Sequence, residues 1–335
     1  MSETNNPLMS VVIATPDHFD TIRMTLQHLM RQTVRRSLEL IIVAPSRAHL
    51  NVHEAELSEF AAAFVRMQIV EVGTIHSIGR ANAAGIRRAA APIVVLAEDH
   101  CFPDPQWAES LIAAHRGPWA AVGPAVRNAN PGTAVSWADL FIGYGPWLCP
   151  ATGREMEFLP GHNTSYKRDR LLDYGQDLES MMEAETLLHW DMRRKGHRLW
   201  LEPTALVAHT NFSLWRSWVP VQYYNGRLFA GARARGMAAW RRLIFVAGSP
   251  LIPPLRLWRI WKGIEAGEQK RRFMLNLPAL VIGLVLDGVG QLVGYAAGIG
   301  DAADDVARYE FHRFQHIRAE DRLALAPVSA KVPIA

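Results

Sequence analysis

The chain has 335 residues, of which 36 are lysine or arginine and 32 are acidic, and its formal net charge is +4. This length accommodates a catalytic domain of about 200 residues and an appendage of about 100. The mild positive charge suits anionic small molecules or an anionic membrane face, and it is too diffuse to indicate nucleic acid. Cys101 and Cys149 are the only cysteines and form no Cys-x-x-Cys pair, which favours a reducing compartment.

Predicted strands and helices alternate through the first hundred residues. Apolar runs predict four strands, at residues 9–15, 38–43, 67–72 and 93–97. Segments with apolar side chains at helical spacing lie between them, and we expect Asp20 or Thr21 to cap the first helix. Because strands that alternate with helices pair in parallel, the pattern predicts an α/β fold with a mostly parallel sheet flanked by helices.

The fourth predicted strand runs directly into Glu98, Asp99 and His100, three side chains that can hold a metal ion. The carboxyl ends of parallel strands line the crevice where ligands bind in open α/β sheets. The sequence therefore indicates a ligand site at this edge. An ordinary polar turn is the alternative, since Pro103 and Pro105 follow within a few residues.

Four motifs, in this order along the chain, resemble those of the family 2 nucleotide-sugar glycosyltransferases, whose fold is called GT-A. They are the strand at 10–15, the Leu-x-x-Leu-x-x-Gln-Thr-like helix at 26–33, the small-residue helix at 79–85 and the turn at 96–105. The similarity covers roughly residues 8–212. It implies a Rossmann-like GT-A catalytic domain over residues 1–212, of the membrane-associated bacterial type, that uses a nucleotide-sugar donor.

The resemblance also implies a set of donor and metal contacts. The implied donor contacts are Thr15, Asp17, Arg80, Asn82, Asp99 and Asn163, and the implied metal ligands are Glu98, His100 and His209. The family's Asp-x-Asp motif reads Glu98-Asp99-His100 here, a mixed set that still accepts Mn²⁺ or Mg²⁺. The family's acidic residue after the second strand is replaced by Ala44-Pro45-Ser46, so the nucleotide is not identified.

A second acidic site follows a motif at residues 159–172 that resembles the family's acceptor-side loop. Counting back from Gly196 places the family's general base on Glu185, although Asp191 stands where the family has an arginine. Inverting transfer needs a carboxylate to take a proton from the acceptor hydroxyl. The alternative for Glu185 is a solvated helix face, and we assign Glu183 to such a structural role.

His209 ends the predicted domain, after two expected closing strands at 198–201 and 205–209. Family members often carry a histidine here that reaches the metal. A structural role for His209 is the alternative. Asn163 and the adjacent His162 are equally open, because either could contact a substrate or stabilise the loop.

The C-terminal third of the chain differs in composition from the residues before it. Residues 213–272 interleave aromatic residues with arginines, which is typical of helices at a membrane interface. Residues 273–300 are long enough to cross or re-enter a bilayer, but Asp287 and Gln291 lie on one helical face, which favours a partner helix or a monotopic arrangement. Buried core helices are the alternative. Residues 301–335 are expected to form a charged, partly helical tail.

Together these features predict an inverting, metal-dependent glycosyltransferase that acts in cell-surface polysaccharide or glycolipid synthesis. Its partners would be a nucleotide-sugar donor, a lipid-linked or glycan acceptor and the membrane, with no nucleic acid. The first ten residues lack an apolar signal core, so the cytoplasmic face of the inner membrane is expected. Two alternatives stay open: a nucleotidyltransferase on the same fold, and a catalytically inactive membrane-bound partner of a glycosyltransferase.

Overall fold

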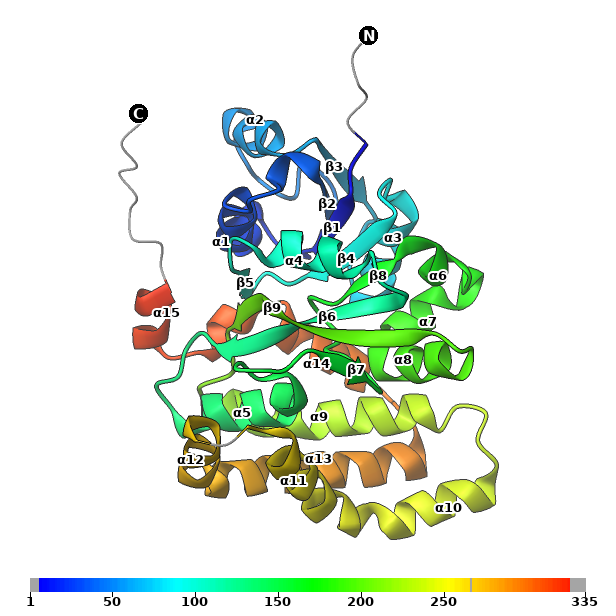
Figure 1. Cartoon of the computed structure of the whole chain (residues 1–335). Coiled ribbons are helices and arrows are strands. Elements are labelled where there is room, and N and C mark those ends of the chain that lie inside the picture. Colours follow the sequence, from blue (N-terminus) through cyan, green and yellow to red (C-terminus); the bar gives the residue numbers. More distant parts are fainter. Residues whose placement is uncertain (1–5, 266, 326–335) are drawn as a thin grey trace.

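One continuous sheet organises the computed structural model, which describes residues 6–265 and 267–325 (Figure 1). Its nine strands, within these residues, follow the order β3 (Arg66–Glu71), β2 (Leu38–Ala44), β1 (Met9–Ala14), β4 (Ile93–Ala97), β8 (Ser165–Lys167), β6 (Trp119–Asn128), β9 (Arg198–His209) and β5 (Cys101–Pro103), with β7 (Arg154–Met156) beside β9. The strands β3, β2, β1 and β4 pair in parallel, whereas β8, β5 and β7 pair antiparallel with their neighbours. The predicted α/β fold is confirmed, and the parallel half is the part whose strands and helices alternate in sequence.

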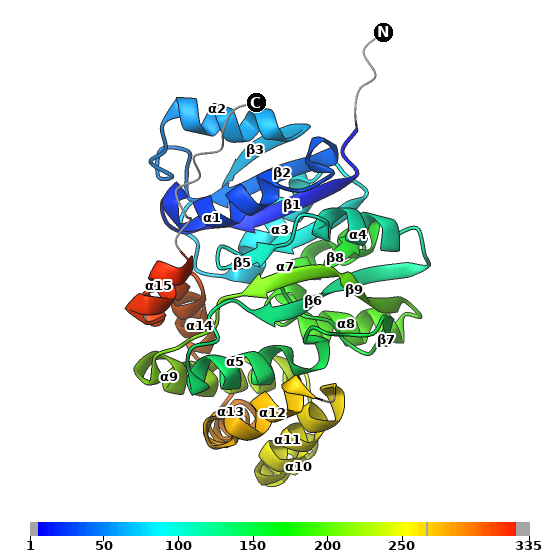
Figure 2. The same ribbon diagram turned by 60° about the vertical axis from the view of Figure 1, so that its left-hand side comes forward.

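Helices cover both faces of the sheet, as Figure 2 shows for β1 and its neighbours. On one face lie α1 (Phe19–Met30), α2 (Glu54–Ala63) and α4 (Trp107–Ala114), and on the other α3 (Ile78–Arg88), α6 (Arg168–Leu172), α7 (Leu178–Met182) and α8 (Glu185–Arg194). In β1, Met9, Val11 and Ile13 enter the first core, and Val12 enters the second. Because both faces are buried, β1, β2 and β4 are mostly apolar in sequence, whereas the edge strand β3 is partly exposed and contains Arg66, Gln68 and Glu71.

Two local predictions are wrong. The first helix begins at Phe19 after His18, without a side-chain cap, and the Thr21 hydroxyl donates to the His18 carbonyl from inside the first turn. Residues 198–209 form one strand and not two. The pairing of β9 with β6 shifts register after Glu202, so a bulge absorbs Pro203 and the ladder continues to His209.

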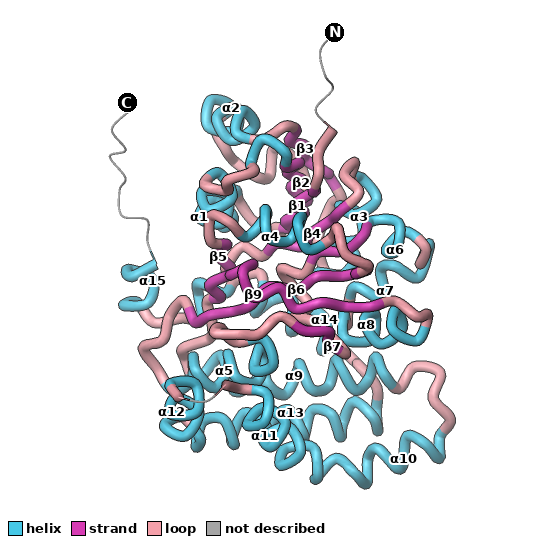
Figure 3. Tube along the Cα trace, viewed as in Figure 1, coloured by secondary structure: helices cyan, strands magenta, loops and turns pink. Residues whose placement is uncertain are grey.

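A layer of helices lies beyond the sheet in Figure 3, built from α5 and from the helices that follow β9. It consists of α5 (Ala134–Tyr144), α9 (Trp215–Arg233), α10 (Ala239–Gly248), α11 (Ile252–Gly263), α12 (Glu268–Leu275) and α13 (Leu277–Ala297). Pro250 and Pro253 lie at the break between α10 and α11. Asp287 of α13 is 2.5 Å from Arg256 of α11 and accepts a hydrogen bond from Gln291. The buried carboxylate is therefore neutralised within the protein.

The glycines of α13 explain how closely this helix approaches α9. A Cβ atom added at Gly290 would lie 2.1 Å from the Tyr223 carbonyl oxygen and 2.9 Å from the Arg227 amide. We expect Gly290→Leu to separate the two helices and to lower the free energy of unfolding by about 1–3 kcal/mol or more. Gly248→Ala is the matched control, since nothing lies within 4 Å of its added Cβ. Equal urea midpoints for the two variants would contradict this packing.

The chain then returns to the sheet. After α13 it forms α14 (Ala302–Glu310), a short 3₁₀ turn (Arg313–His316) and α15 (Ala319–Leu325), which lie beside the sheet in Figures 1 and 2. The expected helix is present, but it does not project away, because Val306, Ala307 and Phe311 are buried against the domain. Residues 326–335 of the predicted tail lie outside the described residues.

Candidate active site

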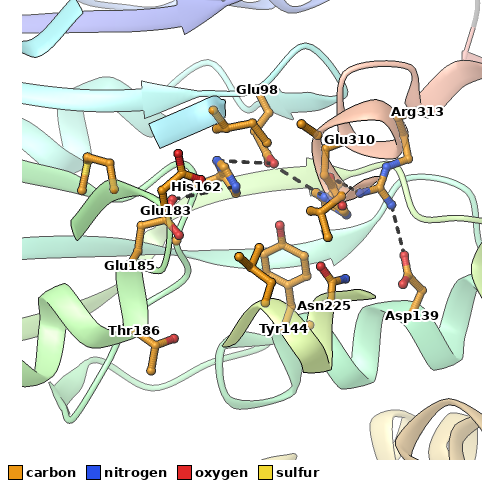
Figure 4. Close-up of a pocket in the computed structure, with 18 of the residues that line it drawn as sticks. Glu98, Asp139, Tyr144, His162, Glu183, Glu185, Thr186, Asn225, Glu310 and Arg313 are labelled. Atoms are coloured by element: carbon orange, nitrogen blue, oxygen red, sulfur yellow. Dashed lines mark hydrogen bonds and ion pairs between the residues drawn. The ribbon is translucent and has the colours of Figure 1, made fainter. Parts of the chain in front are cut away.

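A cavity of about 280 Å³ opens between the end of β4, the loop at 159–164 and the helical layer (Figure 4). Residues from eight separated parts of the chain line it, among them Glu98, Tyr144, His162, Glu183, Glu185, His209, Glu310 and Arg313. The sheet edge at which ligand binding is predicted therefore borders a real cavity, which the helical layer closes from the other side.

Glu98, His100 and His209 form a buried group whose ligand atoms all lie within 4.8 Å of one another. The two histidine rings are 5.0 Å apart, because β5 pairs with the end of β9. His100 Nε2 is buried without a hydrogen-bond partner among residues 6–265 and 267–325. An unsatisfied imidazole nitrogen beside a carboxylate and a second imidazole fits a divalent transition-metal ion. These three residues could hold a metal, and their assignment as its ligands stays a prediction.

Hydrogen bonds from behind orient this group. His209 Nδ1 is 2.9 Å from Asn211 Oδ1, so the Nδ1 proton is donated there and Nε2 is left with a lone pair. Burial and the nearby His100 hold the pKa of His209 well below its ordinary value, which keeps the ring neutral. Asp99 Oδ1 lies 2.5 Å from His100 Nδ1. The predicted donor contact Asp99 therefore orients His100.

Asn163 supports Glu98 in a similar way. Its Nδ2 donates to Glu98 Oε2 at 3.0 Å, and its backbone amide donates to the Leu96 carbonyl. The residue has φ of 60°, a left-handed conformation that asparagine tolerates better than most residues. Asn163 therefore stabilises the loop, and the same conformation fixes the Glu98 carboxylate in the cavity.

Glu185 begins α8 and points into the same cavity. Its carboxylate packs on the backbone at Gly161, where an added Cβ would lie 2.8 Å from Oε2. The His162 ring lies between the two acidic positions, with Nδ1 3.6 Å from Glu98 and Nε2 4.0 Å from Glu185 (Figure 4). Burial raises the pKa of Glu185, and the proximity of His162 opposes that shift. A carboxylate with a raised pKa is a stronger base.

The pKa of His162 moves in the opposite sense to that of an ordinary buried histidine. Burial lowers it, but the carboxylates of Glu98 and Glu185 outweigh burial, so that the net shift is upward. The ring therefore tends to carry a positive charge between two carboxylates. This charge compensates for acidic groups that would otherwise repel one another.

Glu183 also lines the cavity, but the contacts of its side chain support a structural role. The Ser77 hydroxyl, which caps α3, donates to its carboxylate. A Cβ at Gly79 would lie 2.7 Å from the Glu183 backbone nitrogen, so the small residue lets α3 pack directly on this segment. Burial raises the pKa of Glu183 to about 7, and the nearby Glu185 acts in the same direction.

This shift predicts a pH-dependent stability. Between its ordinary value of 4.5 and about 7, the folded protein binds a proton at Glu183 that the unfolded chain does not, so the contribution of this group falls as pH rises through that window. Glu183→Gln mimics the protonated carboxyl. It should match the parent at pH 5 and exceed it at pH 8, by on the order of 1–2 kcal/mol when solvent screening is included. Urea unfolding at both pH values tests this, and a difference independent of pH would contradict it.

The other predicted donor contacts are dispersed. Asn82 and Asp99 line a smaller cavity of about 30 Å³ next to Ala14. Asp17 lies 2.8 Å from His312. Thr15 and Arg80 lie outside the lining of both cavities: Thr15 holds the turn through Thr21 and the Asp17 amide, and the exposed Arg80 faces Glu179.

Residues from the C-terminal segment and from α5 were missed from the sequence. Arg313 lies 3.3 Å from Asp139 of α5 and also pairs with Glu310 (Figure 4). Arg313 packs over the Phe212 ring, 3.7 Å from its centroid. The sequence contains one indication that this segment is buried: the aromatic residues Tyr309 and Phe311 interrupt a stretch that otherwise has the composition of a charged, solvated tail.

Comparisons with known proteins agree with this chain in fold. No family model matches, and no curated protein matches. Among solved structures, S. aureus TarS (residues 1–349, in complex with UDP) is 14% identical, with a TM-score of 0.50 over 92% of this chain and 91% of that one. Mannosyltransferase PcManGT from Pyrobaculum calidifontis, with GDP-Man and Mn²⁺, is 15% identical over 96% and 86% of the two chains, with a TM-score of 0.45.

GalNAc-T7, solved with UDP, GalNAc and Mn²⁺, is 13% identical over 62% of this chain, with a TM-score of 0.48. The match spans only 44% of the GalNAc-T7 chain. The similarity to TarS, with a TM-score of 0.50, extends over nearly the whole of both chains. The chain therefore has the GT-A fold of nucleotide-sugar glycosyltransferases, as the order of its sequence motifs predicts.

Proposed function

We propose that this chain is an inverting glycosyltransferase that moves a sugar from a nucleotide-sugar donor to a membrane-linked or glycan acceptor. The observation that carries the proposal is the cavity lined by Glu185, Glu98 and His209, with His162 between the two acids. His100 completes the metal-type group from the smaller adjoining cavity. One side supplies a base and the other a place for a cation. A metal-dependent inverting transfer uses both.

Glu98, His100 and His209 would hold a divalent ion, Mn²⁺ or Mg²⁺. When bound, the ion would neutralise charge that grows on the departing diphosphate. Glu185 would accept the proton of the acceptor hydroxyl at its carboxylate, and burial, which raises its pKa, favours that transfer. His162 would hold a positive charge beside both acids while the proton moves. Asp99, Asn163 and Asn211 would keep the ligand side chains in place.

The proposed acceptor class follows from an apolar face on the helical layer. Large side chains are exposed there on four helices, α10 to α13, and on the turn between α10 and α11: Trp240, Leu243, Ile244, Leu251, Leu255, Trp258, Trp261, Met274, Leu275, Val281, Ile282, Val285, Val289 and Leu292. Two stretches, Ala239–Gly263 and Leu277–Ala297, are long and apolar enough to cross a bilayer. In an apolar 18-residue window of each, 11% and 50% of the residues, respectively, are buried within the described chain. An exposed apolar surface of this extent indicates an interaction site.

The charge around this face supports a bilayer as its occupant. Residues 239–297 contain eight lysines and arginines against three acidic residues. Lys262 and Lys270 lie over the rings of Trp258 and Trp261, as interfacial residues often do. A spanning α13 would draw α9, with Arg227 and its other arginines, into the hydrocarbon, because the two helices pack side by side. We therefore propose that the face lies in the plane of an anionic leaflet, on the cytoplasmic side.

A vesicle flotation assay tests this face. We expect the full chain to float with vesicles that contain phosphatidylglycerol, and a Leu243→Glu, Trp258→Glu variant to lose about 1.5–3 kcal/mol of binding for each side chain. Leu323→Glu is the control, because Leu323 is also exposed but lies on α15. A double variant that floats like the parent would contradict binding of this face to the bilayer. So would a parent chain that sediments as a dimer while the double variant sediments as a monomer, because a second copy would then cover the face.

Calorimetric titration of UDP- and GDP-sugars, with Mn²⁺ and then with EDTA, tests the proposed activity. Metal-dependent binding of one donor, followed by release of a nucleoside diphosphate with an acceptor, supports glycosyl transfer. Release of pyrophosphate instead identifies the nucleotidyltransferase alternative. Folded protein that binds no donor of the panel would favour the inactive membrane partner.

A further inference from the structure

The C-terminal segment, residues 302–316, places a carboxylate beside the candidate metal ligands Glu98, His100 and His209. Glu310 Oε2 lies 3.8 Å from His100 Nε2, the imidazole nitrogen for which the described part of the chain supplies no hydrogen-bond partner. Glu310 lies more than 200 residues from Glu98 in the sequence, yet both line the two adjoining cavities, and Figure 4 shows them facing the same space. The fourth side chain at this group therefore comes from outside the GT-A domain.

The Glu310 carboxylate forms an ion pair with the buried Arg313. Arg313 in turn is anchored by Asp139 of α5. This chain of ion pairs fixes the segment to the helical layer. It leaves Glu310 as an oxygen ligand directed toward a cation position.

Phe311 and His312, which follow Glu310, lie beside the predicted donor contacts Asn82 and Asp17. Phe311 lines the smaller cavity with Ala14 and Asn82, and His312 lies 2.8 Å from Asp17. That cavity, about 30 Å³, has room for one or two water molecules, whereas sites for small organic ligands usually measure about 300–1,000 Å³. A nucleotide therefore does not fit beside Asn82 while Phe311 stays in place.

We propose that Glu310 is a resting ligand of the metal and that the 302–316 segment closes the donor site until a diphosphate displaces it. This inference rests on the proposed metal site. In the resting protein Glu310 completes the group formed by Glu98, His100 and His209. Donor binding substitutes diphosphate oxygens for the Glu310 carboxylate, and the same movement removes Phe311 and His312 from the nucleoside side.

Manganese titration of the full chain, followed by the EPR signal of free Mn²⁺, tests the ligand. Without nucleotide, Glu310→Gln should weaken Mn²⁺ binding by about tenfold, within the range seen when supporting groups of a metal site are removed. Glu320→Gln is the matched control, an exposed glutamate on α15 of the same C-terminal region. His100→Ala reports on the metal site itself.

Hydrogen exchange of the wild-type protein with saturating Mn²⁺ tests the displacement without any substitution. Addition of inorganic pyrophosphate, which carries a diphosphate and no base, should speed exchange of amides in 302–316, and Glu310→Gln should bind pyrophosphate more tightly than the parent. Unchanged exchange overturns the proposal, as does a Glu310→Gln variant that binds Mn²⁺ like Glu320→Gln. If His100→Ala also binds Mn²⁺ like the parent, it is the proposed metal site that fails; if only His100→Ala loses the ion, the site stands and the resting ligand fails.

Discussion

Glu185→Gln is expected to lower turnover by about 10²–10⁴-fold and to leave metal-dependent donor binding unchanged. The substitution keeps the shape of the side chain at the start of α8 and removes only its ability to accept a proton. Donor binding depends on the opposite side of the cavity, across His162. Initial rates at saturating donor and acceptor, together with calorimetric donor affinity, measure the two effects separately.

The control for this variant is Glu54→Gln. Glu54 is the first residue of α2, as Glu185 is of α8, so both substitutions remove a negative charge from a helix N-terminus. Glu54 is exposed and pairs with Arg47, far from the cavity in sequence and fold. Equal losses of turnover in the two variants would remove Glu185 from the mechanism.

The pH profile of the same enzyme gives an independent readout. Because burial raises the pKa of Glu185, the rate should rise with pH through a value above 4.5, as the base loses its proton. The residual activity of Glu185→Gln should lack this rising limb. The variant should also be no less stable than the parent near neutral pH, since it removes a buried charge.

The parallel half of the sheet was predictable because each of its central strands can be recognised from its own short stretch of sequence. Strands β1, β2 and β4 are buried on both faces, and their sequences are therefore apolar apart from Ser10 and Glu39. Glu98 and His100 follow β4 directly, so the position of the strand alone places them at the ligand-binding edge. The antiparallel strands β5, β7 and β8 have three residues each, which is too short for a periodicity to be recognised.

The C-terminal contribution to the site was not predictable, because it depends on contacts between residues far apart in the chain. In the sequence, Glu310 and Arg313 belong to a charged segment, and such segments usually face water. In the structure, Arg313 is paired with Asp139 and lies over Phe212, two residues that lie some 100 to 170 positions earlier. Nothing in a single sequence identifies which distant carboxylate will neutralise a given arginine.

His100→Ala is expected to abolish measurable Mn²⁺ binding and the metal-dependent part of donor binding, and Glu98→Ala to weaken both by about 10–100-fold or more. The two side chains contribute an imidazole and a carboxylate to one buried group, and His100 Nε2 has no other partner that the described residues supply. EPR titration of Mn²⁺ and calorimetric titration of the donor, with and without EDTA, measure both effects.

The decisive comparison is with His53→Ala, which removes an exposed imidazole that precedes α2 and makes no side-chain cap. Loss of Mn²⁺ binding only in His100→Ala and Glu98→Ala would assign the metal to the end of β4, where the family motif reads Glu-Asp-His. Unchanged metal dependence in that pair would overturn the site assignment. Because the cation is what neutralises the leaving diphosphate, the glycosyltransferase proposal would then depend on Arg313, the buried cation that lines the same cavity.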